Sequence, residues 1–289
     1  MSFPNRRLLR YASADIWPLS QNAAHQGAAR YALSLYALDA VYSFIPKNAC
    51  STLRYSLALA NGVLSGPEQF NWIHTNNPTF RATLAELAKA RYTFVVLRDP
   101  FLRIASCYLD KIAGLTDVAW HYHALTNYRL EPAMVTFREF VMGLRLRLRS
   151  NEHWRPQVDF LVYETYDDYF CVESFGEATR RLGERGFEVH DARPLTRHGS
   201  ERFVPLEGGE SFADTPAHEI AALKRSGRIP RYTQLYDDQL VAAVGGLYAA
   251  DIAFYTTTMQ RSCIFRPVRR DAAPTPSEPA EPSVPGTPD

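Results

Sequence analysis

The stretch that decides the fold covers residues 44–62 and reads FIPKNACSTLRYSLALANG. The apolar run at residues 40–44 predicts a short strand, and Pro46 fixes the direction in which the chain leaves it. Residues 51–60 predict a helix, which the following Asn-Gly pair ends. The stretch therefore predicts a strand, a short loop that carries a lysine, and a helix.

The loop between this strand and helix has the features of an anion-binding site. Ser51 and Thr52 lie where the helix begins, and free backbone N–H groups and the positive end of the helix dipole attract an anion there. Lys47 adds a mobile positive charge that can follow charge developing on a leaving oxygen. The P-loop pattern Gly-x-x-x-x-Gly-Lys-Ser/Thr is absent, because the loop holds no glycine and its lysine precedes the hydroxyls. Taken alone, the loop is also compatible with a helix cap beside a surface lysine.

A second loop follows a second predicted strand. Residues 92–97, YTFVVL, are a continuous β-branched and aromatic run, as expected of a strand buried on both faces. Arg98 leaves this strand, an Asp-Pro pair starts the next helix, and Ser106 lies about two turns along it. The Arg98 fork and the Ser106 hydroxyl are placed to close on one phosphate from two sides. The alternative is an Asp-capped helix that carries surface arginines.

Strand-like and helix-like segments alternate along the chain. This alternation predicts an α/β fold, a P-loop-like three-layer sandwich whose central parallel sheet is flanked by helices, with both loops at the carboxyl ends of strands. The last third is predicted to be mostly helical. A further strand is predicted at residues 158–164, and helices at residues 79–90, 101–112, 135–148, 173–186 and 237–250.

Length and composition favour one enzyme-sized domain. The chain has 289 residues and 46% hydrophobic content, and we place the domain at residues 1–266. Residues 267–289 are rich in Pro, Ala, Ser and acids, so we predict a disordered tail. The formal charge of +1 argues against a general nucleic-acid binder. Only four of the 32 basic residues are lysines, so a lysine in a special position is informative: Lys47, Lys89, Lys111 and Lys224.

Cysteine usage and hydropathy bear on the compartment. The four cysteines are far apart and form no C-x-x-C pair, which favours neither a zinc site nor a disulfide framework and fits a reducing compartment. The N-terminus is too polar for a signal peptide, and no apolar run reaches the roughly 18 residues of a membrane span. We therefore expect a cytoplasmic protein without a membrane span.

Together the two loops resemble sulfotransferases that use 3'-phosphoadenosine 5'-phosphosulfate. The most similar group is the carbohydrate sulfotransferase family that includes the chondroitin and dermatan 4-O-sulfotransferases. Its Pro-Lys-x-Ala-Cys-Thr motif is matched at residues 46–51, and its Arg-x-Pro-Phe-x-Arg-x-x-Ser-x-Tyr-x-x-Lys motif at residues 98–111. Weaker similarity extends through a His-Trp-x-Pro segment at residues 153–156 to about residue 255. A Golgi anchor and the paired cysteines of the family are missing, which fits a bacterial cytosolic relative.

The resemblance implies a reaction, a donor and a set of donor-binding residues. A sulfuryl group would pass to a hydroxyl of a carbohydrate or glycoconjugate, with Lys47 at the leaving phosphate oxygen and no metal. The phosphosulfate loop would be Pro46, Lys47, Asn48, Ala49, Cys50, Ser51 and Thr52. The 3'-phosphate would meet Arg98 and Ser106, together with Arg197 and Ser200 from the polar loop TRHGSERF at residues 196–203.

Two histidines are candidates for the general base, which must work near neutral pH. His74 lies between the two loops, at the end of a predicted short strand at residues 70–73, and related enzymes place a catalytic histidine in this interval. Burial beside Trp72 would keep it neutral. His153 is the rival candidate, and a structural histidine is the alternative for either.

Two other function classes remain open from the sequence. A protein that keeps the nucleotide pocket without catalysis is one, although Lys47 and a candidate base speak against it. A P-loop kinase is the other, weakened by the missing Walker lysine position and the lack of a magnesium-binding carboxylate pattern. A glycan, a glycolipid and a small polyol all remain possible acceptors.

Overall fold

A central four-stranded sheet organises the chain. The computed structural model describes residues 7–14, 16–76, 78–196 and 202–266. The strand order is β1 (Ala32–Leu35), β2 (Ala40–Ser43), β3 (Tyr92–Leu97) and β4 (Asp168–Cys171). β2, β3 and β4 are parallel, and β1 is antiparallel to β2. Every residue of β1, β2 and β3 is buried, as sheets covered on both faces require.

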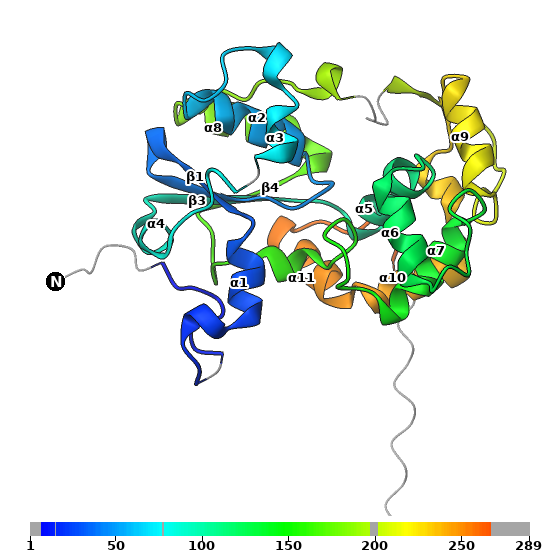
Figure 1. Ribbon diagram of the computed structural model, residues 1–289, viewed down its shortest axis with the longest axis horizontal. Helices are drawn as coiled ribbons and strands as arrows, with labels where there is room; N and C mark the ends of the chain where they lie inside the picture. Colours follow the sequence, from blue (N-terminus) through cyan, green and yellow to red (C-terminus); the bar gives the residue numbers. More distant parts are fainter. Residues whose placement is uncertain (1–6, 15, 77, 197–201, 267–289) are drawn as a thin grey trace, which may run out of the picture.

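Helices form the two outer layers. In Figure 1, α2, α3 and α8 lie over one face of the sheet, and α1 and α11 lie over the other, which confirms the predicted three-layer α/β fold. A second group, α5, α6, α7, α9 and α10, stands beside the sheet, and α9, α10 and α11 make the last third of the chain mostly helical, as predicted. The helices are α1 (Ala23–Ala29), α2 (Cys50–Ala60), α3 (Trp72–Thr75), α4 (Leu84–Lys89), α5 (Pro100–Cys107), α6 (Asp117–Leu125), α7 (Phe137–Gly143), α8 (Phe175–Glu184), α9 (Ala217–Arg225), α10 (Asp238–Leu247) and α11 (Ala249–Met259).

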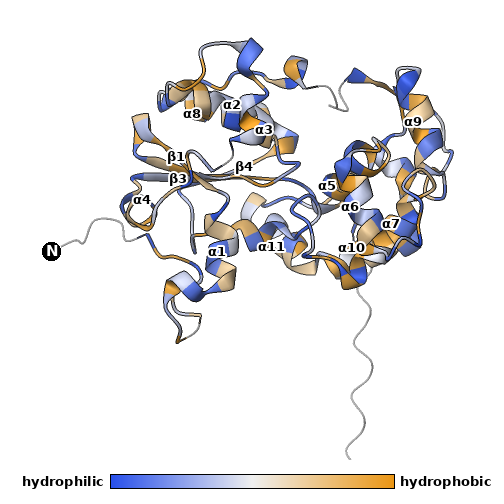
Figure 2. Cartoon of the chain, viewed as in Figure 1, coloured by the Kyte–Doolittle hydropathy of each residue, from blue (hydrophilic) through white to orange (hydrophobic). Residues whose placement is uncertain are grey.

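The helices beside the sheet differ in how much of their surface is buried, and seven of the eight residues of α5 are buried. In Figure 2 they carry both hydrophobic and hydrophilic residues, as amphipathic helices do. A two-residue parallel pair, β5 (Val204–Pro205) and β6 (Arg228–Ile229), lies next to α9.

In the part of the chain that the structure describes, no single helix is long and apolar enough to cross a membrane. Only α10 and α11 together, bent by 84°, pass that test of length and composition.

Most predicted elements are confirmed, with shifted ends. The strands at residues 40–44 and 92–97 are β2 and β3, and the helix after the first loop is α2. The helix predicted at residues 101–112 is α5 followed by a π-helical turn, Tyr108–Ile112. The helices predicted at residues 79–90, 135–148, 173–186 and 237–250 correspond to the shorter α4, α7, α8 and α10.

The strand predicted at residues 158–164 is wrong. A 3-10 turn, Gln157–Phe160, begins this segment after Pro156. The backbone N–H groups of Gln157 and Val158 donate to the buried Asp251 carboxylate, at 2.7 and 3.0 Å, so they are not available to a strand ladder. The strand that joins the sheet here is β4, a few residues later along the chain.

Two further differences concern short segments. Residues 70–73 are not a strand, because the N–H of Ile73 bonds the carbonyl of Phe70 at 3.3 Å and the turn continues into α3. β1 was not predicted, and its antiparallel pairing follows from a tight connection to β2. That connection is a 3-10 turn, Tyr36–Leu38, and Asp39 in the left-handed region at φ 48°.

The sheet brings the two predicted loops to one edge. β2 and β3 run parallel with Ser43 opposite Val95, so the chain leaves both strands on the same side. The Asp99 carboxylate caps α5, accepting from the N–H groups of Phe101 and Leu102 at 2.8 and 3.4 Å. The predicted tail, residues 267–289, lies outside the described residues.

Candidate functional site

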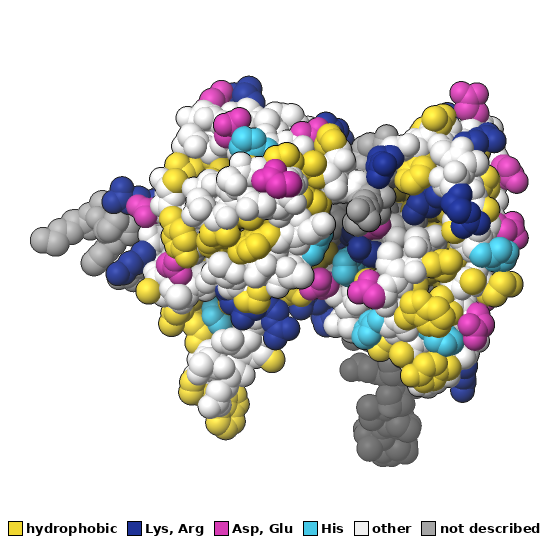
Figure 3. Space-filling model, turned by 45° about the horizontal axis from the view of Figure 1, so that its top comes forward, with side chains coloured by type: hydrophobic (Ala, Val, Ile, Leu, Met, Phe, Trp, Pro, Cys, Tyr) yellow, Lys and Arg dark blue, Asp and Glu magenta, His cyan; other side chains and the backbone are white. Residues whose placement is uncertain are grey.

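A cavity of about 870 Å³ opens where the two loops meet. Figure 3 shows a hollow between the part built on the sheet and the helical part, with histidine and basic side chains along it. Most of the predicted site residues line this one cavity: Pro46, Lys47, Ala49, Cys50, Ser51, Thr52, His74, Arg98, Ser106 and His153. Arg197 and Ser200 lie outside the described residues, although Thr196, directly before them, also lines the cavity.

The first loop has an unusual backbone for a segment without glycine. Lys47 and Ala49 both have positive φ angles, 74° and 55°, in the left-handed region that disfavours side chains. Two arginines of the second loop and its helix hold this shape. Arg103 Nε donates to the Pro46 carbonyl at 3.1 Å, and Arg98 Nη1 donates to the Lys47 carbonyl at 2.9 Å. Arg103 is therefore a buried structural residue and not a surface arginine.

Asn48 supports the loop from behind. Its side chain is fully buried, and Nδ2 donates to the Val96 carbonyl at 2.9 Å and to Gln157 Oε1 at 2.6 Å. The prediction that Asn48 contacts the ligand with the rest of the loop is therefore not met by its side chain, which points into the core. Gln157 in turn bonds both backbone groups of Arg98, at 3.0 and 2.9 Å, so the two loops share one buried bridge.

The start of α2 faces the cavity without a cap. Among the described residues, no side chain caps its first turn with a hydrogen bond. The N–H groups of that turn have no acceptor within the helix, and Cys50, Ser51 and Thr52 line the cavity. This end of α2 therefore offers backbone N–H groups to the cavity, which is the feature that the predicted anion site requires.

Three of the four lysines in the chain line the cavity. Lys47 Nζ lies 2.6 Å from Asp110 Oδ2, and Lys111 Nζ lies 3.5 Å from the same oxygen. Lys224 Nζ donates to the Leu109 carbonyl at 2.8 Å, and burial lowers the pKa of Lys224. The sequence analysis assigned a role only to Lys47. The small number of lysines in the chain was a signal that could also have pointed to Lys111 and Lys224.

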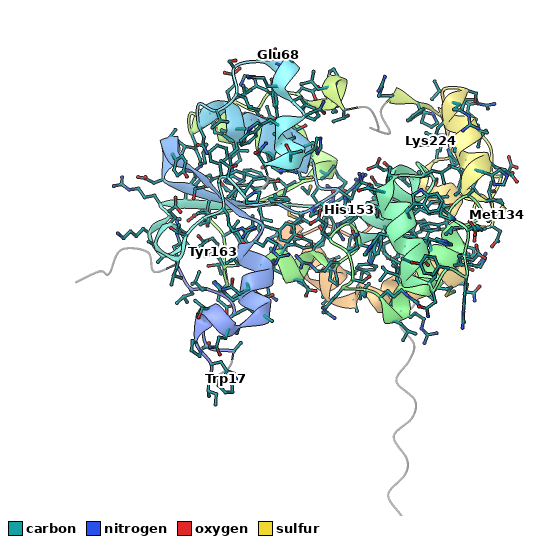
Figure 4. The ribbon with its side chains drawn as sticks, viewed as in Figure 1. Trp17, Glu68, Met134, His153, Tyr163 and Lys224 are labelled. Atoms are coloured by element: carbon teal, nitrogen blue, oxygen red, sulfur yellow. The ribbon has the colours of Figure 1, made fainter. Side chains whose placement is uncertain are left out.

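His153 is oriented by its own segment. Asn151 Oδ1 accepts from the His153 backbone N–H at 2.9 Å and lies 2.8 Å from the ring Nδ1. An amide oxygen only accepts, so Nδ1 carries the hydrogen and Nε2 keeps its lone pair. Burial, followed by the charges of Lys111 and Lys47, lowers the pKa of His153 to about 3, which keeps the ring neutral. Figure 4 shows His153 between the sheet and the helical part.

His74 lies in a different environment from the one predicted. It is exposed, and its ring meets Phe70 edge-on at 5.5 Å. The expected burial beside Trp72 is wrong, because the helical turn of α3 directs Ile73 into the core and Trp72 packs against Phe80, with the ring centroids 5.8 Å apart. His74 still lines the cavity.

The second loop brings Arg98 and Ser106 to the same cavity. The Arg98 guanidinium lies 5.5 Å from the Tyr232 ring, and Nη2 donates to the Tyr232 hydroxyl at 3.4 Å. Sequence reasoning missed Tyr232, because it follows a two-residue strand without a recognisable motif. It also missed Arg54, a cavity-lining arginine of α2 whose guanidinium lies 5.0 Å from the Phe44 ring. Among the residues that the structure describes, no group of three His, Cys, Asp or Glu side chains is arranged to hold a metal ion.

Comparison with known proteins agrees with this geometry. Residues 38–256 match the Sulfotransferase family. Over 132 residues the chain is 30% identical to carbohydrate sulfotransferase 14 of Mus musculus and, equally, to that of Homo sapiens. The match covers 40% of this chain and only 35% of either relative. No solved structure gives a significant match.

The causes of the low His153 pKa can be tested directly. In the protein without ligand, the imidazole should stay neutral down to about pH 4, with a midpoint near 3. Lys47→Ala should raise that midpoint because one nearby positive charge is removed. The measurement is an NMR titration of the imidazole Cε1–H signals, with His153→Gln used to assign the resonance. A midpoint near 6.5 in the unsubstituted protein would contradict the burial and charge argument.

Proposed function

Because the chain belongs to the sulfotransferase family, we propose that it transfers a sulfuryl group from 3'-phosphoadenosine 5'-phosphosulfate to a hydroxyl of a carbohydrate or glycoconjugate. One observation carries the proposal: Lys47, the uncapped start of α2, and the Arg98–Ser106 pair face one cavity. The names of the two mammalian relatives support a carbohydrate as the acceptor.

The donor would lie across the cavity between its two anion-binding regions. Its phosphosulfate binds the first turn of α2, where Lys47 reaches the oxygen that joins phosphorus to sulfur. Its 3'-phosphate binds Arg98 and Ser106, and the sequence resemblance assigns Arg197 and Ser200 to the same phosphate. Two fixed anion sites at opposite ends of one nucleotide select a bisphosphate over a nucleoside monophosphate.

The transfer step then balances in one displacement. The acceptor oxygen forms a bond to sulfur while the bond from sulfur to the bridging oxygen breaks. The electron pair of the broken bond stays on the 5'-phosphate, beside the Lys47 ammonium. The proton of the acceptor hydroxyl passes to a histidine. As in phosphoryl transfer, the protein supplies in-line placement and charge stabilisation.

We assign the base to His153 in preference to His74. The Asn151 contact leaves Nε2 of His153 as the free acceptor nitrogen. Burial is the largest cause of the low His153 pKa, and the charges of Lys111 and Lys47 add to it; both lysines line the cavity, so a bound phosphosulfate would oppose their charges and raise the basicity of the ring. His74 is exposed and has no comparable burial.

The role of Lys47 defines the first test. Lys47→Ala should lower kcat by roughly 10²–10³-fold, because its ammonium acts on charge that develops only in the transition state. The affinity for adenosine 3',5'-bisphosphate should change much less. Transfer of labelled sulfate to a panel of glycans, glycolipids and polyols gives the rate, and a thermal-shift titration gives the affinity.

Lys89→Ala is the matched control, since Lys89 is an exposed lysine of α4 outside the cavity. Near-normal turnover in Lys47→Ala would refute the assignment. Donor binding without any transfer would instead support a catalytically inactive nucleotide-binding protein. Stabilisation by ATP and magnesium, but not by the bisphosphate, would support a kinase.

The 3'-phosphate site gives the second test. Arg98→Ala and Ser106→Ala should weaken binding of adenosine 3',5'-bisphosphate, by about tenfold or more for the arginine. Neither should affect binding of adenosine 5'-phosphosulfate to the same degree, because that nucleotide lacks the 3'-phosphate. Calorimetric titration of both nucleotides measures the difference, and equal losses for the two would place these residues elsewhere along the donor.

The choice of base gives the third test. His153→Ala should lower kcat by roughly 10²–10⁴-fold, the usual range for a lost general base, and flatten the acid limb of the pH–rate profile. His74→Ala should act mainly on the acceptor KM. If His74→Ala flattens the profile and His153→Ala does not, the base is His74, as its position between the loops first indicated.

A further inference from the structure

The closest polar contact of Lys47 is a carboxylate that neither loop motif explains. Asp110 lies in the π-helical turn Tyr108–Ile112 that follows α5. Its Oδ2 accepts from Lys47 Nζ at 2.6 Å, with 15% and 7% of the lysine and aspartate side chains exposed. Both partners line the cavity, so this pair forms part of its wall.

Positive charge surrounds Asp110 on several elements. Lys111, on the same turn, has its Nζ at 3.5 Å from Oδ2. Lys224 on α9 also interacts with the Asp110 charge, and the neighbouring His153 ring is neutral. A carboxylate in an anion-binding cavity opposes ground-state binding of a phosphosulfate. Its presence here calls for a role other than affinity.

The shape of the helix is what directs Asp110 at the cavity. A π-helical turn changes the register of the residues that follow it, and such turns occur often at functional sites. The carbonyl of Leu109, within this turn, accepts from Lys224 Nζ at 2.8 Å. Lys224 thereby stabilises the turn from a separate helix, and Asp110 is held against Lys47.

We propose that Asp110 is a positioning residue for Lys47, a role that rests on the proposed function. A lysine side chain is a flexible four-carbon stem, and its ammonium has three N–H groups that can donate. One N–H group of Lys47 bonds Asp110. This contact directs the other two N–H groups toward the bridging oxygen of the phosphosulfate. Because Nζ is already fixed before the reaction, the lysine side chain loses no further conformational entropy in the transition state. The carboxylate costs some donor affinity and increases the rate of transfer.

The test relies on the opposite effects expected on the transfer rate and on nucleotide affinity. Asp110→Asn should lower kcat by about 10–100-fold, because Lys47 loses its fixed direction. The same variant should bind adenosine 3',5'-bisphosphate equally well or up to about tenfold more tightly, because a negative charge has left the cavity. A merely structural role would weaken both quantities. Asp110→Glu keeps the charge but displaces it, so its kcat should lie between those of the other two proteins, with the affinity of the unsubstituted protein.

A double-mutant cycle isolates the pair. In the Lys47→Ala background, Asp110→Asn should change kcat by less than about threefold, since there is no ammonium left to direct. Asp159→Asn is the matched control: it removes a 2.7 Å ion pair with Arg149 that lies outside the cavity, and should leave rate and affinity unchanged.

Two results would overturn the positioning role. One is an unchanged kcat in Asp110→Asn; the other is a full additional loss in the Lys47→Ala background. Either result, with normal sulfate transfer in the unsubstituted protein, would refute this role alone. An unsubstituted protein that neither binds the bisphosphate nor transfers sulfate would instead refute the proposed function and, with it, this inference.

Discussion

The buried carboxamide of Gln157 joins the three segments on which the site depends. It bonds the side chain of Asn48 from the first loop and both backbone groups of Arg98 from the second. The Asp251 carboxylate on α11 fixes its backbone in turn. A buried amide that lost any of these partners would leave a polar group unsatisfied, at a cost of about 1–3 kcal/mol each. The distance between the two loops is therefore set by a bridge within the core.

Arg103 adds a second constraint from the opposite side. Its guanidinium is buried and donates to backbone carbonyls of Pro46, Glu152 and Arg155. One side chain thus links the lysine loop to the segment that carries His153. The pKa of Arg103 is lowered by burial, with the charge of Asp251 opposing that shift. The relative position of Lys47 and His153 follows from this fixed cation.

The electrostatics of the cavity are dominated by several cations that line it together. Lys47, Lys111 and Lys224 share it, and the charges of the first two lower the pKa of His153. A bound anion would oppose the two lysine charges, although burial remains the larger cause of the low pKa. Under the proposed function, donor binding and activation of the acceptor would therefore be coupled through charge.

The sequence by itself determined the two central strands of the sheet, β2 and β3, the two loops that follow them and their shared edge. Continuous apolar runs specify β2 and β3, and a proline, a lysine and an Asp-Pro pair mark where the chain leaves them, all of which are local properties. The tertiary structure alone decided the rest. Residues 158–164 have the composition of a strand, but the N–H groups of Gln157 and Val158, where the segment begins, donate to a distant carboxylate, Asp251. The exposure of His74, the partial burial of His153 and the contact between Lys47 and Asp110 likewise depend on segments far apart in the chain. Hydrogen-bond partners and local charge come from such distant segments, and no local pattern encodes them.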